Sequence, residues 1–156
     1  MQRYIWSKLN KQQVGAFAEY FVKMELTMYG FQVYGTEVDD RGVDFVARFE
    51  RGPFIEVQVK SIRSVGYVFV QKEKFQLREN LFLALGILFE RQPPDLYLIP
   101  ATAWAESSGA LVSRDYQGLK SKPEWGVNVS NRNLPSLSAY RFGTVVDDLL
   151  KQWALH

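Results

Sequence analysis

The chain of 156 residues contains no cysteine, and its only histidine is the last residue, His156. The lack of cysteine excludes disulfides, thiolate nucleophiles and cysteine-based zinc sites. A histidine at a chain end is usually frayed, so Ser-His-Asp triads and histidine-bound metal ions are disfavoured as well. We therefore expect any metal ion to be held mainly by oxygen, a preference shared by Mg²⁺, Mn²⁺ and Ca²⁺.

Long apolar runs are also missing. The longest, Leu81–Phe89, has nine residues, well short of the roughly 20 that a membrane-spanning helix needs. Residues 1–14 hold no apolar stretch like that of a signal peptide, so we expect a cytoplasmic protein that does not associate with a membrane. The formal net charge is only +2, which by itself does not indicate a nucleic-acid partner.

The composition is that of one folded domain. Hydrophobic residues make up 47% of the chain and aromatic residues 15%, enough apolar surface to offset the entropy lost on folding. The length is typical of a single domain, and no linker or internal repeat is visible. We expect one domain over residues 1–156.

Helical spacing marks both ends of the chain. Apolar residues three and four positions apart predict a helix over 11–29, ended by Gly30, and the residues concerned are Val14, Phe17, Ala18, Phe21, Met24 and Met28. A strand is expected over 31–38. Near the C-terminus, Thr144 and Asp147 resemble a capping box ahead of an apolar stripe, which predicts a final helix.

Two stretches in the first half alternate with a period of two. Apolar residues stand at the odd positions of 43–49 and of 55–60, and a turn is expected over 50–53. Alternate side chains point to opposite faces of a strand, so a hairpin that buries both apolar sets gathers the even positions on the other face. Asp44 then lies across from Gln58 or Lys60, with Glu56 on the same face.

The remaining segments complete a mixed α/β (α+β) pattern. We expect strands over 67–71, 81–90 and 96–99, a short helix over 72–80 and another after Pro100. The stretch 107–138 is rich in Gly, Ser, Asn and Pro, which indicates loops around brief strands such as 126–129.

These residues together resemble the PD-(D/E)XK nuclease superfamily. The resemblance rests on a helix with Glu19, on Gly-Val-Asp44 and on Glu-Val-Gln58-Val-Lys60-Ser, the Gln-x-Lys form shared with some restriction and intron-encoded homing endonucleases. Residues 95–100 with Trp104 also resemble poorly characterised bacterial members. The resemblance implies a restriction-endonuclease-like core, in which an N-terminal helix precedes a mixed β-sheet flanked by helices and a C-terminal helix follows.

The resemblance also implies a metal-dependent DNA endonuclease. Phosphodiester hydrolysis needs an activated water and charge stabilisation at the phosphate, and an oxygen-bound divalent ion supplies much of both. Asp44, Gln58 and the backbone carbonyl of Val59 would hold Mg²⁺ or Mn²⁺, and Glu56 or Glu19 would add the negative charge that Gln58 lacks. Lys60 would position the attacking water or help to deprotonate it, and would stabilise phosphate charge.

Partners and alternatives follow from the same residues. Arg63, Lys72, Lys74 and Arg78 would follow a DNA backbone or form an ordinary solvated face. Cutting both strands usually takes two sites, so a homodimer or higher homo-oligomer is expected.

Each site residue also has a structural interpretation. Asp44 would cap backbone amides, Glu19 would be a surface residue, Lys60 a solvated lysine, and Glu56 would pair with Arg48 or Lys60. The alternative functions are a nucleic-acid-binding module without cleavage and a glycoside hydrolase with Asp44 and Glu56 as paired carboxylates.

Overall fold

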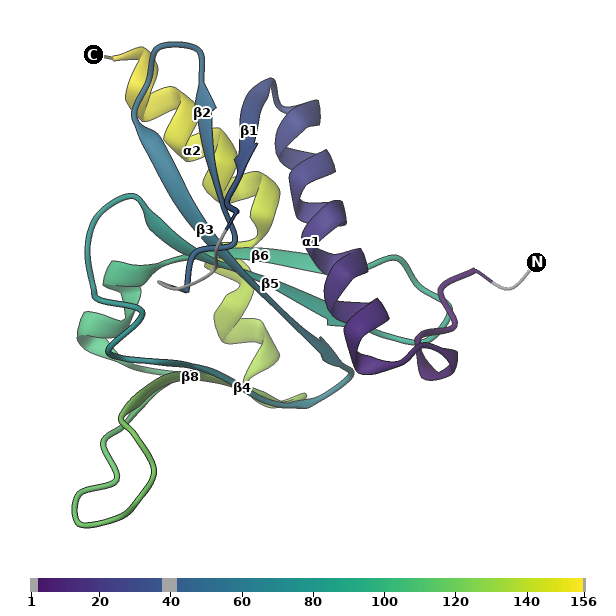
Figure 1. The fold of residues 1–156 in the computed structure, drawn as a ribbon, viewed down its shortest axis with the longest axis vertical. Helices are drawn as coiled ribbons and strands as arrows, with labels where there is room; N and C mark the ends of the chain where they lie inside the picture. Colours follow the sequence, from purple (N-terminus) through teal and green to yellow (C-terminus); the bar gives the residue numbers. More distant parts are fainter. Residues whose placement is uncertain (1–2, 38–41, 156) are drawn as a thin grey trace.

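The computed structural model describes residues 3–37 and 42–155. Across these ranges the chain forms two α-helices, three short 3₁₀ segments and eight strands (Figure 1). The helices are α1 (Lys11–Met28) and α2 (Phe142–Ala154), and the 3₁₀ segments are η1 (Trp6–Lys8), η2 (Ala101–Glu106) and η3 (Leu134–Tyr140). The strands are β1 (Phe31–Gly35), β2 (Phe45–Phe49), β3 (Phe54–Arg63), β4 (Gly66–Gln71), β5 (Leu81–Leu88), β6 (Asp95–Pro100), β7 (Leu111–Arg114) and β8 (Glu124–Val129).

The strands form two sheets. The larger has the order β1-β2-β3-β5-β6, with β3 and β5 parallel and the other neighbours antiparallel. The smaller is antiparallel, with the order β4-β8-β7. Both α-helices pack on one face of the larger sheet, and the smaller sheet lies against the opposite face (Figure 1). The protein is therefore a mixed α+β structure in three layers, with an apolar core on each face of the central sheet.

Local sequence signals explain α1. Asn10 and Gln13 form a reciprocal capping box at its first turn, and Val14, Ala18, Val22 and Leu26 form its buried stripe. Gly30 follows with φ +96°, a conformation that glycine adopts without steric cost. The strand expected over 31–38 ends at Gly35, and residues 38–41 lie outside the described residues.

The capping box predicted for α2 is wrong. The helix begins at Phe142, so Thr144 and Asp147 lie inside it, and Arg141 at the N-cap makes no side-chain cap. The preceding segment η3 delivers the chain to the helix, and a bridge between Arg141 and Tyr97 fixes the entry point. Tertiary contacts therefore set this boundary.

The short helix predicted over 72–80 does not form. After one turn the segment runs irregularly, because its groups bond to the smaller sheet instead. The Lys72 amide donates to the Pro123 carbonyl, the Phe75 carbonyl accepts from the Trp125 indole, and the Phe75 ring is fully buried. The other strands predicted in this half and the short helix after Pro100 are confirmed, with shifted ends.

The course of β3 and β4 positions the site. β2 pairs with β3 only as far as Val57, whereas β5 follows β3 to Arg63. After a connection through Ser64 and Gly66, both with positive φ, the chain enters the smaller sheet as β4. Within the described ranges no strand pairs with the β2-side edge of β3 beyond Val57 or with the outer edge of β4. A cleft separates these two edges.

No helix in the described part of the chain is long and apolar enough to cross a membrane.

Candidate functional site

Asp44 stands where β2 parts from β3. The register pairs Phe45 with Val57, and the Asp44 amide donates to the Val57 carbonyl at 2.9 Å. Asp44 is therefore opposite Gln58, one of the two partners that the alternation allowed. Its Oδ2 accepts a hydrogen bond from the Val59 amide at 2.6 Å. The carboxylate therefore accepts the hydrogen bond that the backbone of β2 would accept if β2 extended further along β3. This contact holds it at the edge of β3.

The side chain of Gln58 carries an unusual oxygen. Its Oε1 is buried and has no hydrogen-bond partner among the described residues. Gly42 lies directly against it, since a Cβ on Gly42 would come within 3.2 Å of that oxygen, and Gly42 has φ +72°. A buried acceptor without a donor costs about 1–3 kcal/mol. A cation at this position would satisfy the oxygen.

The nearby oxygens form a donor set suited to a hard cation. Carbonyls two residues apart on a strand point to the same edge, so the Val59 carbonyl faces the side where the Val57 carbonyl meets Asp44. One carboxylate, one amide oxygen and one backbone carbonyl therefore belong to residues along the same stretch of this edge. Oxygen donors of these kinds are those that Mg²⁺ and Mn²⁺ accept. No group of three or more Asp, Glu or His side chains placed to hold a metal occurs in the described ranges, so such a site relies on neutral oxygens.

Lys60 lies two residues beyond Gln58 and is half-buried. Its side chain borders two hollows: one of about 230 Å³ shared with Gln58 and Gly42, and a cleft of about 630 Å³ that extends toward α1. Within the described part of the chain its ammonium forms no ion pair or hydrogen bond. Lys60 therefore presents an uncompensated positive charge where the two hollows meet.

The two candidate glutamates have basic partners. Glu56 is ion-paired with Arg78, whose Nε lies 3.1 Å from Oε2, rather than with Arg48 or Lys60. Glu19 is paired with Lys23 at 3.2 Å on α1, on the helix side of the sheet. The structure brings Asp44, Gln58 and Lys60 together and holds both glutamates in other pairs.

Of the four predicted phosphate-binding cations, Arg78 is the partner of Glu56, and the other three differ in their surroundings. Arg63 lines the larger cleft and also donates to the Trp6 carbonyl at 3.2 Å. Lys74 is exposed and lines the smaller hollow. Lys72 is engaged within the smaller sheet, where Asp115 and Ser113 lie 2.7 and 2.6 Å from its ammonium.

Sequence reasoning missed several residues of the cleft, among them Lys11, Tyr67 and Phe69. Lys11 is the first residue of α1 and carries no motif. A strand over 67–71, as predicted, implies that Tyr67 and Phe69 share one face. What it did not indicate is which element this face meets.

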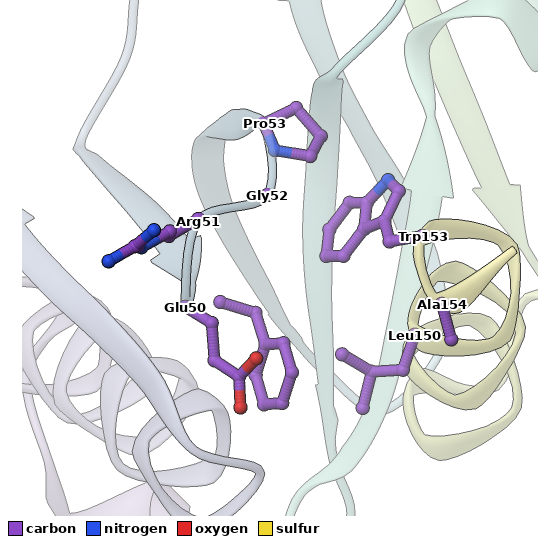
Figure 2. A pocket seen from close by; sticks show the side chains of 8 residues that line it. Glu50, Arg51, Gly52, Pro53, Leu150, Trp153 and Ala154 are labelled. Carbon is purple, nitrogen blue, oxygen red and sulfur yellow. The ribbon is translucent and has the colours of Figure 1, made fainter. Parts of the chain in front are cut away.

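A separate hollow lies at the other end of the β2–β3 hairpin. Figure 2 shows the turn Glu50–Pro53 facing Leu150 and Trp153 of α2 around a space of about 500 Å³. Trp153 also packs edge-on against Phe31, with ring centres 6.0 Å apart. The lining of this hollow includes only one carboxylate and one guanidinium among apolar groups. We therefore place the candidate functional site at the Asp44 end of the hairpin.

Comparisons with known proteins place the fold. No protein-family model matches the sequence, and no curated protein matches it. Hjc, a Holliday junction resolvase from Archaeoglobus fulgidus, is a similar solved structure, with a TM-score of 0.56 and 15% identity over 85% of this chain and 95% of that one. The bacterial homing endonuclease I-Ssp6803I gives a TM-score of 0.56 and 16% identity over 94% of this chain and 95% of its own. The chain therefore has the restriction-endonuclease-like fold that the sequence predicted.

Proposed function

We propose that this protein is an endonuclease that hydrolyses phosphodiester bonds in DNA with Mg²⁺ or Mn²⁺. The observation that carries the proposal is the meeting of Asp44, Gln58 and Lys60 at one strand edge, with a buried Gln58 oxygen that has no hydrogen-bond partner among the described residues. The fold adds support, because the two similar structures are a resolvase and a homing endonuclease.

Three oxygens would hold the metal ion: a carboxylate oxygen of Asp44, Oε1 of Gln58 and the carbonyl of Val59. When bound, the ion supplies positive charge at the phosphate and makes a water more acidic. The hydrogen bond from the Val59 amide fixes the Asp44 carboxylate in orientation before any ion arrives. Gln58 contributes no charge, so we expect weaker metal binding than a glutamate would give.

Lys60 acts on the phosphate and the attacking water. In hydrolysis the water oxygen bonds to phosphorus, the bond to the leaving sugar oxygen breaks, and that oxygen takes up a proton. Negative charge grows on the phosphate oxygens during this step. The Lys60 ammonium is a compact charge without a protein counter-ion in the described ranges, so it stabilises this charge and orients the water.

A second carboxylate would complete the charge. Glu56 is the better placed candidate, because it lies two residues before Gln58 on the same face of β3. Its pair with Arg78 is about two-fifths exposed, and exposed pairs are worth only about 0–1 kcal/mol. Glu56 can therefore exchange Arg78 for a cation at little cost. Glu19 would act from the helix side and would have to leave Lys23.

DNA contact and assembly extend the same proposal. Arg63 and Lys74 border the two hollows and would bind flanking phosphates, with Lys72 as an outer contact. Two copies of the chain would supply one site to each strand of a duplex. Light scattering with and without DNA tests this expected homodimer.

The deciding experiment is cleavage of supercoiled, linear and branched DNA in Mn²⁺, Mg²⁺ or EDTA. The wild type should cut only with metal, and Lys60→Ala and Asp44→Asn should lose on the order of 100-fold or more in rate. Lys151→Ala, which removes an exposed lysine of α2, is the matched control and should cut like the wild type. Metal-dependent cleavage that persists in both site variants would overturn the proposed mechanism.

A nucleic-acid-binding module without cleavage is the second candidate. It is favoured by Gln58 in place of a carboxylate and by the lack of a three-carboxylate group in the described ranges. Salt-sensitive DNA binding with no cleavage in any metal would support it. The glycoside-hydrolase alternative, with Asp44 and Glu56 as paired carboxylates, gains no support from the fold, because the two similar structures are a resolvase and a homing endonuclease.

A further inference from the structure

An exposed aromatic pair borders the site. Tyr67 and Phe69 lie on the same face of β4, with ring centres 6.0 Å apart and planes within 19° of each other. Phe69 is 46% exposed. It lines both hollows that meet at Lys60. A large apolar ring is thus left open to solvent beside the proposed catalytic lysine.

Tyr67 holds this pair in a fixed orientation. Its hydroxyl donates to the carboxylate of Glu124, the first residue of β8, which is only 6% exposed. Its ring lies against the backbone of Gly126, where a Cβ would come within 2.1 Å of the hydroxyl oxygen. The Arg114 guanidinium lies 4.1 Å from the ring centre. The ring beside Phe69 is therefore anchored on the sheet.

The cleft next to Phe69 combines aromatic and positive groups. Lys11, Lys60 and Arg63 line it together with the two rings. Aromatic rings that stack on bases and cations that bind phosphates are the pairing by which proteins hold single-stranded nucleic acid. The volume of about 630 Å³ falls in the range of about 300–1,000 Å³ typical of sites for one small ligand. Bases inside an intact duplex are stacked on one another, so only a nucleotide outside the stack can reach the ring.

We propose that Phe69 stacks on an unpaired nucleotide and that the protein prefers DNA with single-stranded or extruded nucleotides beside the cut. This inference rests on the proposed function, because it places the nucleotide next to Lys60. Phe69 acts as a specificity-determining residue, while Arg63 and Lys11 hold the adjoining phosphates.

The test is binding of fluorescein-labelled DNA in EDTA, where no cleavage occurs. The probes are an intact duplex, the same duplex with a three-nucleotide bulge, and the single strand. The wild type should bind the bulged duplex and the single strand more tightly than the intact duplex. Phe69→Ala should weaken binding of those two probes by about 5- to 150-fold, the range found when a base-stacking aromatic residue is replaced.

Two further variants make the result specific. Phe69→Leu keeps apolar bulk but loses the flat ring, so it should weaken binding as Phe69→Ala does. If the alanine variant does not fold, the leucine variant provides the test. Phe54→Ala is the matched control, since Phe54 is an exposed phenylalanine of similar accessibility at the start of β3, away from the cleft. It should bind all probes like the wild type.

The outcomes separate the two proposals. The inference is overturned if Phe69→Leu binds all probes like the wild type, if all probes weaken equally, or if the wild type binds none of them. Loss confined to the unpaired probes supports it even where the metal assays detect no cleavage, in which case the nuclease proposal alone fails. Metal-dependent cleavage with no selective loss in the Phe69 variants leaves the nuclease standing and removes this inference.

Discussion

Replacing Gln58 by methionine should stabilise the metal-free protein. Methionine has nearly the same length and volume, and it removes the buried Oε1 that has no partner in the described ranges. Leaving a buried polar atom unsatisfied costs about 1–3 kcal/mol. Taking the lower end, we expect the free energy of unfolding to rise by about 1 kcal/mol, which for a chain of this size raises Tm by about 2–4 °C.

The effect should reverse when metal is added. At a Mg²⁺ concentration of ten times its dissociation constant, a ligand that binds only the folded state stabilises it by about 1.4 kcal/mol. The wild type should gain this amount, and Gln58→Met, which lacks the amide oxygen, should gain much less. Gln58→Met, the more stable of the two proteins in EDTA, would then be equal to or less stable than the wild type in Mg²⁺. Its rate of metal-dependent cleavage should also be lower than that of the wild type.

Urea unfolding followed by circular dichroism, in EDTA and in Mg²⁺, measures both terms. Gln12→Met is the matched control, because Gln12 is exposed on α1 and the two residues have similar helix propensity. It should stay within about 0.5 kcal/mol of the wild type in both conditions. A Gln58→Met protein that is less stable than the wild type in EDTA would refute the reasoning, since Oε1 would then be making a favourable contact.

Four other perturbations test further contacts of the structure. Gly126→Ala places a Cβ within 2.1 Å of the Tyr67 hydroxyl oxygen and should cost about 1–3 kcal/mol in urea unfolding. Gly15→Ala, with nothing within 4 Å, should instead stabilise α1 by about 0.5–1 kcal/mol. Burial raises the pKa of Tyr67 well above its usual value, and the hydrogen bond to Glu124 raises it further. The neutral form is therefore favoured by folding, and this contribution is complete below about pH 10 and lost as pH rises beyond it. Tyr67→Phe should lose stability less steeply than the wild type above that pH, and equal slopes would contradict the assignment. Glu56→Gln frees Arg78 and should cost less than about 1 kcal/mol of stability, while calorimetry should detect weaker Mg²⁺ binding; unchanged affinity would remove Glu56 from the ligand set.

The hairpin could be predicted because its pattern is local. A period of two fixes which side chains share a face, and the short turn limits the register to a few choices. Asp44 and Gln58 therefore meet as one of the two expected pairs. The helix α1 was equally predictable, since spacing, capping and a terminal glycine all agree.

The rest of the site depends on contacts between distant segments. The smaller sheet pairs Gly66 with Val129. These residues are far apart in the sequence, so no local pattern predicts that they are partners. Only that sheet brings Phe69 to Lys60 and draws residues 72–80 out of a helix. The partner of Glu56 follows from the same cause, because Arg78 lies in that rerouted segment.

The two strand edges at the cleft have a consequence for solubility. Unpaired strand edges are templates on which other chains add strands and aggregate, and proteins commonly protect them with charged side chains. Lys60 and Arg63 lie along the edge of β3 that β2 leaves uncovered within the described ranges. The residues proposed to attract a phosphate backbone thus also repel a second copy of the same edge. The same positive charge therefore serves both the proposed phosphate contact and the solubility of the fold, and neutralising it would leave this edge open to edge-to-edge assembly.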